Sequence, residues 1–259
     1  MAPFGGKIAV IEISGTIGRR TRPETHLPLL ERVRDSKRLH ALVLAIDSPG
    51  GAAPASEELY LGVAKVAASK PVVACIRGMG TSGALYVASG AHKVIAVRNA
   101  MVGSIGVIFA QPIAEQLFQK IGLSFSVRKT GPHKDIFGPW RAPTEDENKK
   151  LDDLMGEVFE RFIEVVAQGR KMSPDAVRQL ATGEVFTAQR AKELGLVDEL
   201  GDMEDALNVA AKMAGIRKQV TYLRPKRRMF PLLRGGLGEE LTNAFMEEVE
   251  AGMMGRLRM

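Results

Sequence analysis

Short apolar runs rich in β-branched residues recur along the first hundred residues and predict buried strands, at residues 7–13, 41–46, 71–76 and 94–97. The stretches between them have the composition and apolar spacing of helices, at residues 25–37, 55–69 and 82–90. Strands that are buried on both faces and alternate with helices indicate a parallel sheet with right-handed crossovers. The pattern therefore predicts an α/β fold with a mainly parallel sheet and flanking helices.

The pattern changes after residue 103. Residues 107–120 combine a strand-like start with an amphipathic helix, and residues 123–127 are typical of another strand. Residues 131–143 contain three prolines and the single tryptophan, and we interpret them as a mobile loop that orders when a substrate or a neighbouring subunit packs on it. The longest predicted helix covers residues 144–169 and begins with a capping-box pattern at Thr144.

In the C-terminal third, the sequence predicts shorter helices and strands, followed by a basic segment near the end. A helix capped by Ser173, a strand and turn at 195–201 and a helix at 205–215 complete the first predicted domain, residues 1–222. Residues 223–259 then form a basic linker and an amphipathic helix at 239–250. This second part either contacts anionic lipid, docks on a neighbouring subunit, or is simply a packed or frayed terminus.

Composition excludes several classes of protein. The chain has 259 residues and a net charge of +6, but its 36 basic and 30 acidic residues are interspersed and aromatic residues are few, so nucleic-acid binding is not indicated. No zinc-ligand spacing or phosphate-binding loop occurs, so we expect no metal or cofactor. Cys75 is the only cysteine, which rules out an intrachain disulfide and predicts a buried thiol.

No apolar stretch approaches the roughly 18 residues of a membrane span, and the N-terminus lacks the apolar core of a signal peptide. We therefore expect a soluble chain, either cytoplasmic or peripherally associated with a membrane.

Ser82 is the candidate nucleophile because it lies between an apolar strand and a helix, within Gly78-Met79-Gly80-Thr81-Ser82-Gly83. Small flanking residues let a carbonyl group approach such a serine, and the N-terminus of a helix offers free N–H groups to an oxyanion. Considered alone, the motif is also typical of a serine that caps a helix beside glycines that turn the chain.

A serine nucleophile needs a base. None of the four histidines, His26, His40, His92 and His133, has an evident aspartate to orient it, so the sequence does not support a Ser/His/Asp triad. The better candidate is Lys134, in a polar loop bracketed by apolar residues. A lysine acts as a base only when burial lowers its pKa towards neutrality, and a single lysine is more often a solvated surface residue.

Lys134 is the candidate base because four motifs occur in a particular order along the chain. They are Asp47-Ser48-Pro49-Gly50-Gly51, Ser82-Gly83-Ala84-Leu85-Tyr86, Gly103-Ser104-Ile105-Gly106-Val107, and the loop of residues 129–135, which contains His133-Lys134-Asp135. In this order, and with an interval of 52 residues from Ser82 to Lys134, the chain resembles the signal peptide peptidase A family of Ser/Lys proteases over residues 7–200. The family usually has an aromatic residue at the position of Leu85.

The resemblance implies a role for each matched residue. Ser82 would be the nucleophile, Lys134 the general base, and Ser104 a hydroxyl that orients the lysine amine. The N–H of Gly83, with an N–H from the Gly50-Gly51 turn, would form the oxyanion hole. The resemblance also implies the spiral of β-β-α units shared by Clp protease and crotonase.

The implied activity is that of a serine endopeptidase that degrades apolar peptides, such as cleaved signal-peptide remnants in or near membranes. Relatives assemble into dome-like rings in which the serine and the lysine can come from adjacent protomers. Two other functions stay open: a crotonase-like enzyme that acts on an acyl-CoA thioester, and a non-catalytic ring scaffold at a membrane.

Overall fold

The computed structural model describes residues 6–225. All but the last of these belong to one compact unit, Met1–Arg224. The expected basic linker and the helix at 239–250 lie outside the described residues.

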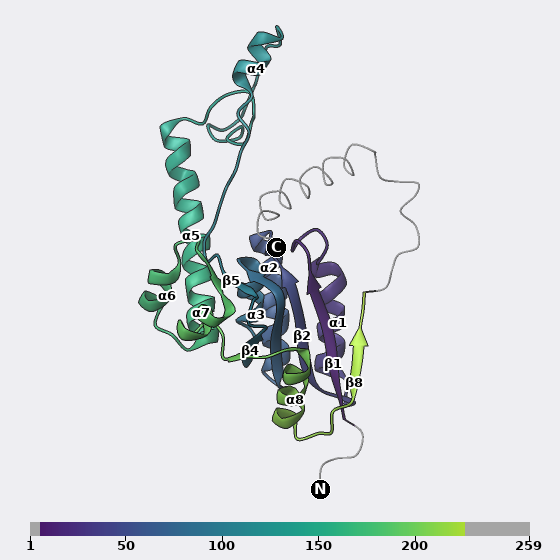
Figure 1. Ribbon diagram of the computed structural model, residues 1–259. Helices are drawn as coiled ribbons and strands as arrows, with labels where there is room; N and C mark the ends of the chain where they lie inside the picture. The colour runs from purple at the N-terminus through teal and green to yellow at the C-terminus, as the bar shows by residue number, and fades with distance from the viewer. Residues whose placement is uncertain (1–5, 226–259) are drawn as a thin grey trace. The chain divides into compact units, whose positions relative to one another are not determined.

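The described chain contains a series of strands and helices that Figure 1 labels in order. The strands are β1 (Lys7–Ser14), β2 (Leu39–Ser48), β3 (Val72–Thr81), β4 (Lys93–Ala96), β5 (Met101–Gly103), β6 (Val185–Thr187), β7 (Glu199–Leu200) and β8 (Val220–Leu223). The helices are α1 (Pro23–Asp35), α2 (Ala53–Ala67), α3 (Gly83–Ala88), α4 (Glu115–Lys120), α5 (Glu145–Arg170), α6 (Pro174–Leu180), α7 (Ala188–Glu193) and α8 (Met203–Ala214).

The strands form one sheet in the order β6-β5-β3-β2-β1-β8, and β4 and β7 continue it beside β3. All pairs are parallel except β5 with β6, which confirms the prediction of a mainly parallel sheet. β3 has two partners on one side, because residues 73–76 pair with β4 and residues 79–81 pair with β5. The long strand β3 therefore carries the chain from the core of the sheet to its carboxyl edge.

Each face of the sheet has its own apolar layer, because alternate strand residues point to opposite faces. One face packs on α1, α2, α3 and the C-terminal half of α5, through residues such as Leu44, Leu59 and Val166. The other face packs on α8, through residues such as Val43 and Ala210. Cys75 lies in this second layer as predicted, and its burial raises the pKa of the thiol to about 11.

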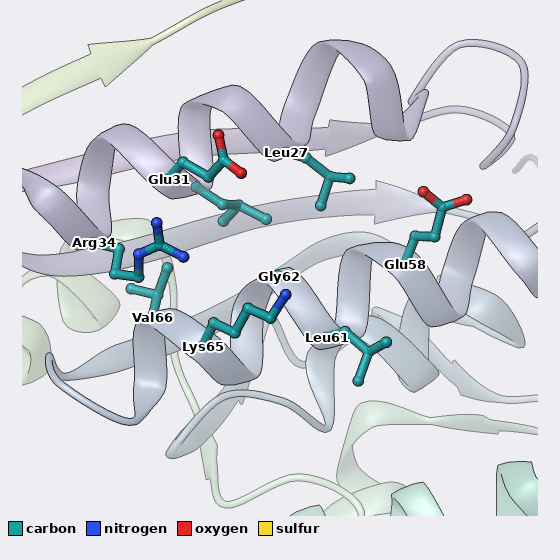
Figure 2. Close-up of a pocket in the computed structure, with 9 residues that line it drawn as sticks. Leu27, Glu31, Arg34, Glu58, Leu61, Gly62, Lys65 and Val66 are labelled. Atoms are coloured by element: carbon teal, nitrogen blue, oxygen red, sulfur yellow. The ribbon is translucent and has the colours of Figure 1, made fainter.

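Helices α1 and α2 pack side by side on the first face. A side chain at Gly62 would place its Cβ 2.8 Å from atoms of both Leu27 and Leu30, so glycine allows the two helices to approach closely. Figure 2 shows the shallow pocket of about 210 Å³ that lies between them, with charged side chains such as Arg34 and Lys65 at its edge. None of the predicted site residues lines this pocket.

Two predictions for the segment after β5 were wrong. Residues 123–127 form no strand, and the helix expected within 107–120 is reduced to α4. Residues 107–143 contribute nothing to either apolar layer of the sheet. Figure 1 shows them at the N-terminal end of α5, and we call this segment the arm.

The arm is held together by its own aromatic residues. Phe125 contacts Phe118 with ring centroids 4.7 Å apart and stacks on Trp140 at 5.7 Å. Phe109 and Phe137 form a second pair at 5.5 Å. This clustering explains the apolar pattern at 123–127, because the alternate side chains pack within the arm or face solvent rather than entering the sheet.

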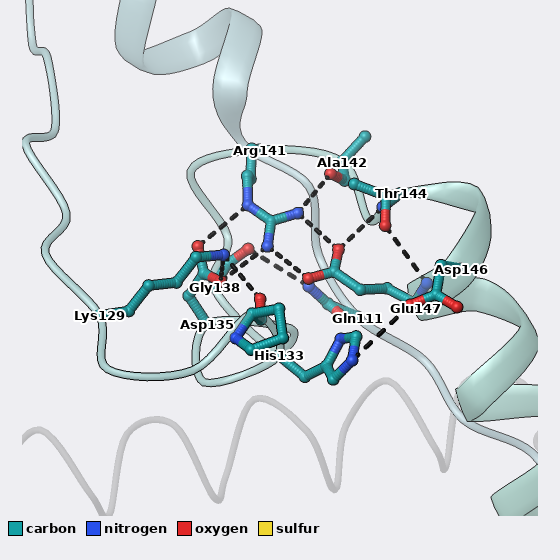
Figure 3. A network of polar contacts seen from close by, with 11 residues as sticks. Gln111, Lys129, His133, Asp135, Gly138, Arg141, Ala142, Thr144, Asp146 and Glu147 are labelled. Atoms are coloured by element: carbon teal, nitrogen blue, oxygen red, sulfur yellow. Dashed lines mark hydrogen bonds and ion pairs between the residues drawn. The ribbon is translucent and has the colours of Figure 1, made fainter.

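Four charged side chains join the arm to the start of α5, and we call them the arm clamp: Lys129, Asp135, Arg141 and Glu147 (Figure 3). Arg141 forms two hydrogen bonds with Asp135, at 3.0 and 2.8 Å, and two with Glu147, both at 2.7 Å. Lys129 Nζ donates to Asp135 at 2.5 Å. Glu147 also completes the predicted capping box with Thr144, so the clamp is attached to the first turn of α5.

These contacts shift the pKa values of the clamp. Hydrogen bonds from Arg141 lower the pKa of Glu147 to about 2, and hydrogen bonds from Arg141 and Lys129 hold the pKa of Asp135 well below its usual range. The same carboxylates raise the pKa of Arg141. Asp135, Glu147 and Arg141 are therefore charged at neutral pH.

Helix α5 extends from the arm to the core. It is the longest helix and confirms the predicted element at 144–169 within one residue at each end. Among the helices of residues 6–225, none combines the length and apolarity that crossing a bilayer requires.

Replacing Gly169 of α5 with alanine should destabilise the fold by about 1–3 kcal/mol, because α5 approaches α3 closely at this point. The new Cβ would lie 2.0 Å from the Ser89 carbonyl oxygen. Gly156→Ala is the matched control: nothing lies within 4 Å of its Cβ, and alanine at a helix interior stabilises by about 0.5–1 kcal/mol. Urea unfolding of both variants checks the prediction, and equal effects in the two would contradict the described packing.

Acid should loosen the arm before it unfolds the sheet. The lowered pKa values mean that Asp135 and Glu147 contribute stability fully above their ordinary values of 3.8 and 4.5, and this stability is lost as the pH falls from there towards 2. Trp140 is the only tryptophan, so its fluorescence reports on the arm alone, whereas circular dichroism reports on the whole chain. We expect the fluorescence to change first on acidification. Coincident transitions would contradict a local effect.

Candidate active site

Ser82 lies where β3 ends and α3 begins. Its backbone has φ 51° and ψ −125°, a conformation that residues other than glycine rarely adopt. The surroundings hold it there, because the Ser82 N–H donates to the Gly103 carbonyl at 2.8 Å and the Ser82 carbonyl accepts from Tyr86 N–H at 3.1 Å. Strained backbone of this kind is concentrated at functional sites. The side chain is half-buried and reaches the edge of the sheet.

The turn after β2 approaches this serine closely. A Cβ added to Gly50, at φ 97°, would lie 2.6 Å from the Gly83 nitrogen and 2.8 Å from the Ser82 Cβ, so only glycine fits here. Ser48 fixes the turn, because its hydroxyl donates to the Gly15 carbonyl at 2.6 Å and accepts from the Gly50 N–H at 3.1 Å.

The N–H groups of this turn are not equivalent. The Gly50 N–H is used by Ser48. The N–H groups of Gly51 and Gly83, in contrast, have no acceptor within residues 6–225. They are near one another, since a Cβ on Gly83 would lie 3.3 Å from the Gly51 nitrogen. Two free donors beside a serine are suited to binding an oxygen that becomes negatively charged.

Ser104 lies next to Ser82 along the edge of the sheet. The parallel register pairs Thr81 with Gly103, so the two serines are the residues that follow paired positions on β3 and β5. Ser104 also has a positive φ, 52°, and its N–H donates to the Glu184 carbonyl at 2.6 Å. The structure thus brings together Ser82, Ser104 and the Gly50-Gly51 turn.

A polar contact beside the candidate nucleophile joins α3 to α2 and α5. Tyr86 donates a hydrogen bond to Glu57, whose other oxygen accepts from Arg161 at 3.0 Å. The Tyr86 ring also packs on Tyr60 and Phe162, at 5.4 and 5.1 Å. Burial and the Glu57 carboxylate raise the pKa of Tyr86, so this hydroxyl stays protonated and acts as a donor. The sequence gives no signal for this contact, because the three residues that form it lie far apart along the chain.

Leu85, the departure from the usual motif, is fully buried in the first apolar layer. Its side chain therefore packs in the core.

Lys134 lies in the arm and is exposed. Its backbone N–H donates to the Gly131 carbonyl at 3.3 Å, within the same loop. Among residues 6–225, no contact joins Lys134 to Ser82 or Ser104. The structure of one chain therefore assembles the serines and the two free N–H groups but leaves the predicted base apart from them.

The histidines also stay apart from Ser82 among the described residues. His133 has an aspartate neighbour, because its Nε2 lies 3.6 Å from an oxygen of Asp146, a residue of α5. This pair belongs to the arm. The His92 ring accepts from the Val72 N–H at 3.1 Å, at the opposite end of β3 from Ser82. No cluster of histidine, cysteine and acidic side chains within residues 6–225 could hold a metal ion.

The sequence profile of peptidase family S49 matches residues 64–217, which include Ser82, Ser104 and Lys134. A putative protease of Synechocystis is 40% identical over 81% of this chain and 75% of its own length. A putative signal peptide peptidase of Enterococcus faecium is 33% identical over 73% of this chain. The match covers 55% of that relative, so the chain spans about half of its length.

Among solved structures, a mutant of a membrane-bound stomatin-specific protease has a similar fold, with a TM-score of 0.54. The likeness covers 85% of this chain and 99% of the other at 18% sequence identity. It supports the expected Clp protease-like arrangement of the sheet and its helices. The family profile and the Synechocystis relative show that the chain belongs to peptidase family S49, a family of serine peptidases.

Proposed function

We propose that Ser82 is the nucleophile of this peptidase, Lys134 its general base, and the N–H groups of Gly51 and Gly83 its oxyanion hole. The observation that carries the proposal is the strained turn at Ser82 beside two N–H groups that have no acceptor within the described chain. Such donors stabilise a transition state without having to reorganise.

The chemistry requires one proton carrier. A neutral Lys134 amine takes the proton of the Ser82 hydroxyl as its oxygen attacks the peptide carbonyl. The resulting oxyanion accepts hydrogen bonds from Gly51 and Gly83, and the lysine ammonium returns the proton to the leaving amine. Water then attacks the acyl-enzyme with Lys134 again as base. Ser104, beside Ser82, is placed to orient the amine once Lys134 arrives.

Lys134 must come to Ser82 from elsewhere, and we propose that the arm of a second copy delivers it. The arm exposes large apolar side chains, at residues Ile108, Ile113, Leu117, Ile121 and Phe137. An apolar surface of this kind marks an interaction site. Burial of the arm against a neighbouring chain would also exclude water from Lys134. A lysine base requires such burial because it lowers the pKa of the amine. Such sites, repeated around a closed ring, make a homo-oligomer.

For substrates, we propose apolar peptides such as the remnants of cleaved signal peptides. The apolar side chains of the arm would border a site completed in this way. The Enterococcus relative carries the name of a putative signal peptide peptidase. Residues 223–259 would add peripheral membrane contact through their basic side chains.

Ser82→Ala and Lys134→Ala should each lower kcat for an apolar fluorogenic peptide by at least about 1000-fold, because nucleophile and base act as a unit. Ser69→Ala and Lys212→Ala, at exposed positions away from the proposed site and the arm, are the matched controls and should retain activity. Circular dichroism and sedimentation of each variant confirm fold and assembly. Full activity in either site variant would refute the assignment of that residue.

Mixing the two inactive variants tests whether a site is shared. If Ser82 and Lys134 act across copies, a one-to-one mixed assembly should recover about a quarter of the wild-type activity, because about one site in four then combines two intact residues. The subunits are mixed by dissociation and reassembly, and each variant reassembled alone is the control. No recovery from a demonstrably mixed assembly would show that serine and lysine come from the same chain.

A further inference from the structure

Lys134 is carried on a loop whose two ends are tied by the arm clamp. The residue after it, Asp135, is largely buried, with a side chain that is 8% exposed, and both of its oxygens are engaged. The neighbour of the proposed base is therefore fixed, although the base itself is exposed.

We propose that Arg141 is a positioning residue that sets where the arm presents Lys134; this inference rests on the proposed function. Arg141 is central because it contacts both carboxylates of the clamp. Its guanidinium makes five hydrogen bonds: two to Asp135, two to Glu147 and one to the Ala142 carbonyl at 3.1 Å. A guanidinium has five N–H donors in a planar fork, so all of them are used.

The clamp links the loop to a rigid element. Glu147 is 3% exposed and lies in the first turn of α5, where it completes the capping box with Thr144. The other end of α5 packs in the core, and Phe162 contacts the ring of Tyr86 behind the nucleophile. Arg141 therefore transmits the position of α5 to the residue beside Lys134.

The charges of the clamp also cancel. Arg141 and Lys129 are matched by Asp135 and Glu147, so the clamp adds no net charge near Lys134. A lysine at position 141 preserves this balance but has three donors on one nitrogen, and it cannot hold both carboxylates in two-point contact. Arg141→Lys thus removes the geometry of the clamp and keeps its charge.

The test compares three variants of the full chain. Arg141→Lys removes the fork, and Glu147→Gln removes one charge but keeps a residue that supports a capping box. Arg178→Lys is the matched control, because Arg178 also makes a two-point pair, with Glu160, but both side chains are about half exposed. Each variant is assayed for kcat and KM with the apolar peptide between pH 6 and 10. Hydrogen exchange of residues 129–143 is measured in the Ser82→Ala background, which needs no activity.

We expect Arg141→Lys to lower kcat by about 10- to 100-fold with little change in KM, because a mobile base reduces turnover more than binding. The rise of kcat with pH should move to higher pH, since a loosely held lysine is less well shielded from water. Exchange within residues 129–143 should increase. Glu147→Gln should show the same changes to a smaller extent, and Arg178→Lys should match the wild type.

Three results would overturn the inference. Unchanged kcat and unchanged hydrogen exchange in Arg141→Lys would show that the two-point contacts of the guanidinium are not needed to position Lys134. Faster exchange with unchanged kcat and pH profile would make the clamp a purely structural contact. Wild-type hydrolysis that survives Lys134→Ala would remove the proposed function itself, and it is distinguishable because that variant does not touch the clamp.

Discussion

The close approach of two backbone turns is the constraint on which the site depends. Residues 49–51 follow β2 and residues 82–83 follow β3, and these strands are neighbours in a parallel sheet, so their carboxyl ends meet at one edge. The turns come so close that Gly50 has no room for a side chain. The backbone itself fills this space, and the N–H groups of Gly51 and Gly83 lie near one another with no acceptor among residues 6–225. The proposed oxyanion hole thus depends on sheet register and glycine placement.

The second constraint is the length of α5. One end of this helix lies in the core, where Arg161 shares Glu57 with Tyr86 of the nucleophile helix. The other end carries Glu147 and, through Arg141, the loop of the proposed base. A helix rises 1.5 Å per residue, so Glu147 and Arg161, 14 residues apart, are separated by about 21 Å along α5. One rigid element therefore holds the proposed nucleophile and base apart within a chain, which agrees with a site that two copies complete.

The sequence predicted those elements whose patterns are local and strong. Strands β1 to β4, the capping box at Thr144 and the helix that follows it were predicted from apolar spacing and cap residues. The end of β3 was not, because Gly78 and Gly80 are poor strand formers. They are strand residues here because the neighbouring strands supply partners: Gly80 pairs with both Ser48 and Val102. The strand propensity of single residues does not predict a pairing of this kind.

The strand predicted at residues 123–127 was wrong for the opposite reason. The apolar side chains alternate there because they make contacts within the arm, and not because the segment joins a sheet. The residues of the candidate site also differ in whether the sequence alone reveals them. A glycine-flanked serine after a strand is visible in the sequence, whereas Arg141 and Tyr86 gain their roles only from partners in other elements. Nor does any sequence signal show that Lys134 is separated from Ser82, because spacing along the chain does not give distance in space.

The independence of the arm from the two apolar layers has an evolutionary consequence. Its aromatic contacts are made among its own residues, and no residue of 107–143 belongs to either apolar layer, so changes within the arm should leave the packing of the sheet unaffected. Selection can therefore alter the surface that the arm presents without losing the fold. The turn at 49–51 has no such freedom, and the molecule combines a fixed edge of the sheet with an arm whose exposed surface can vary around Lys134 and the arm clamp.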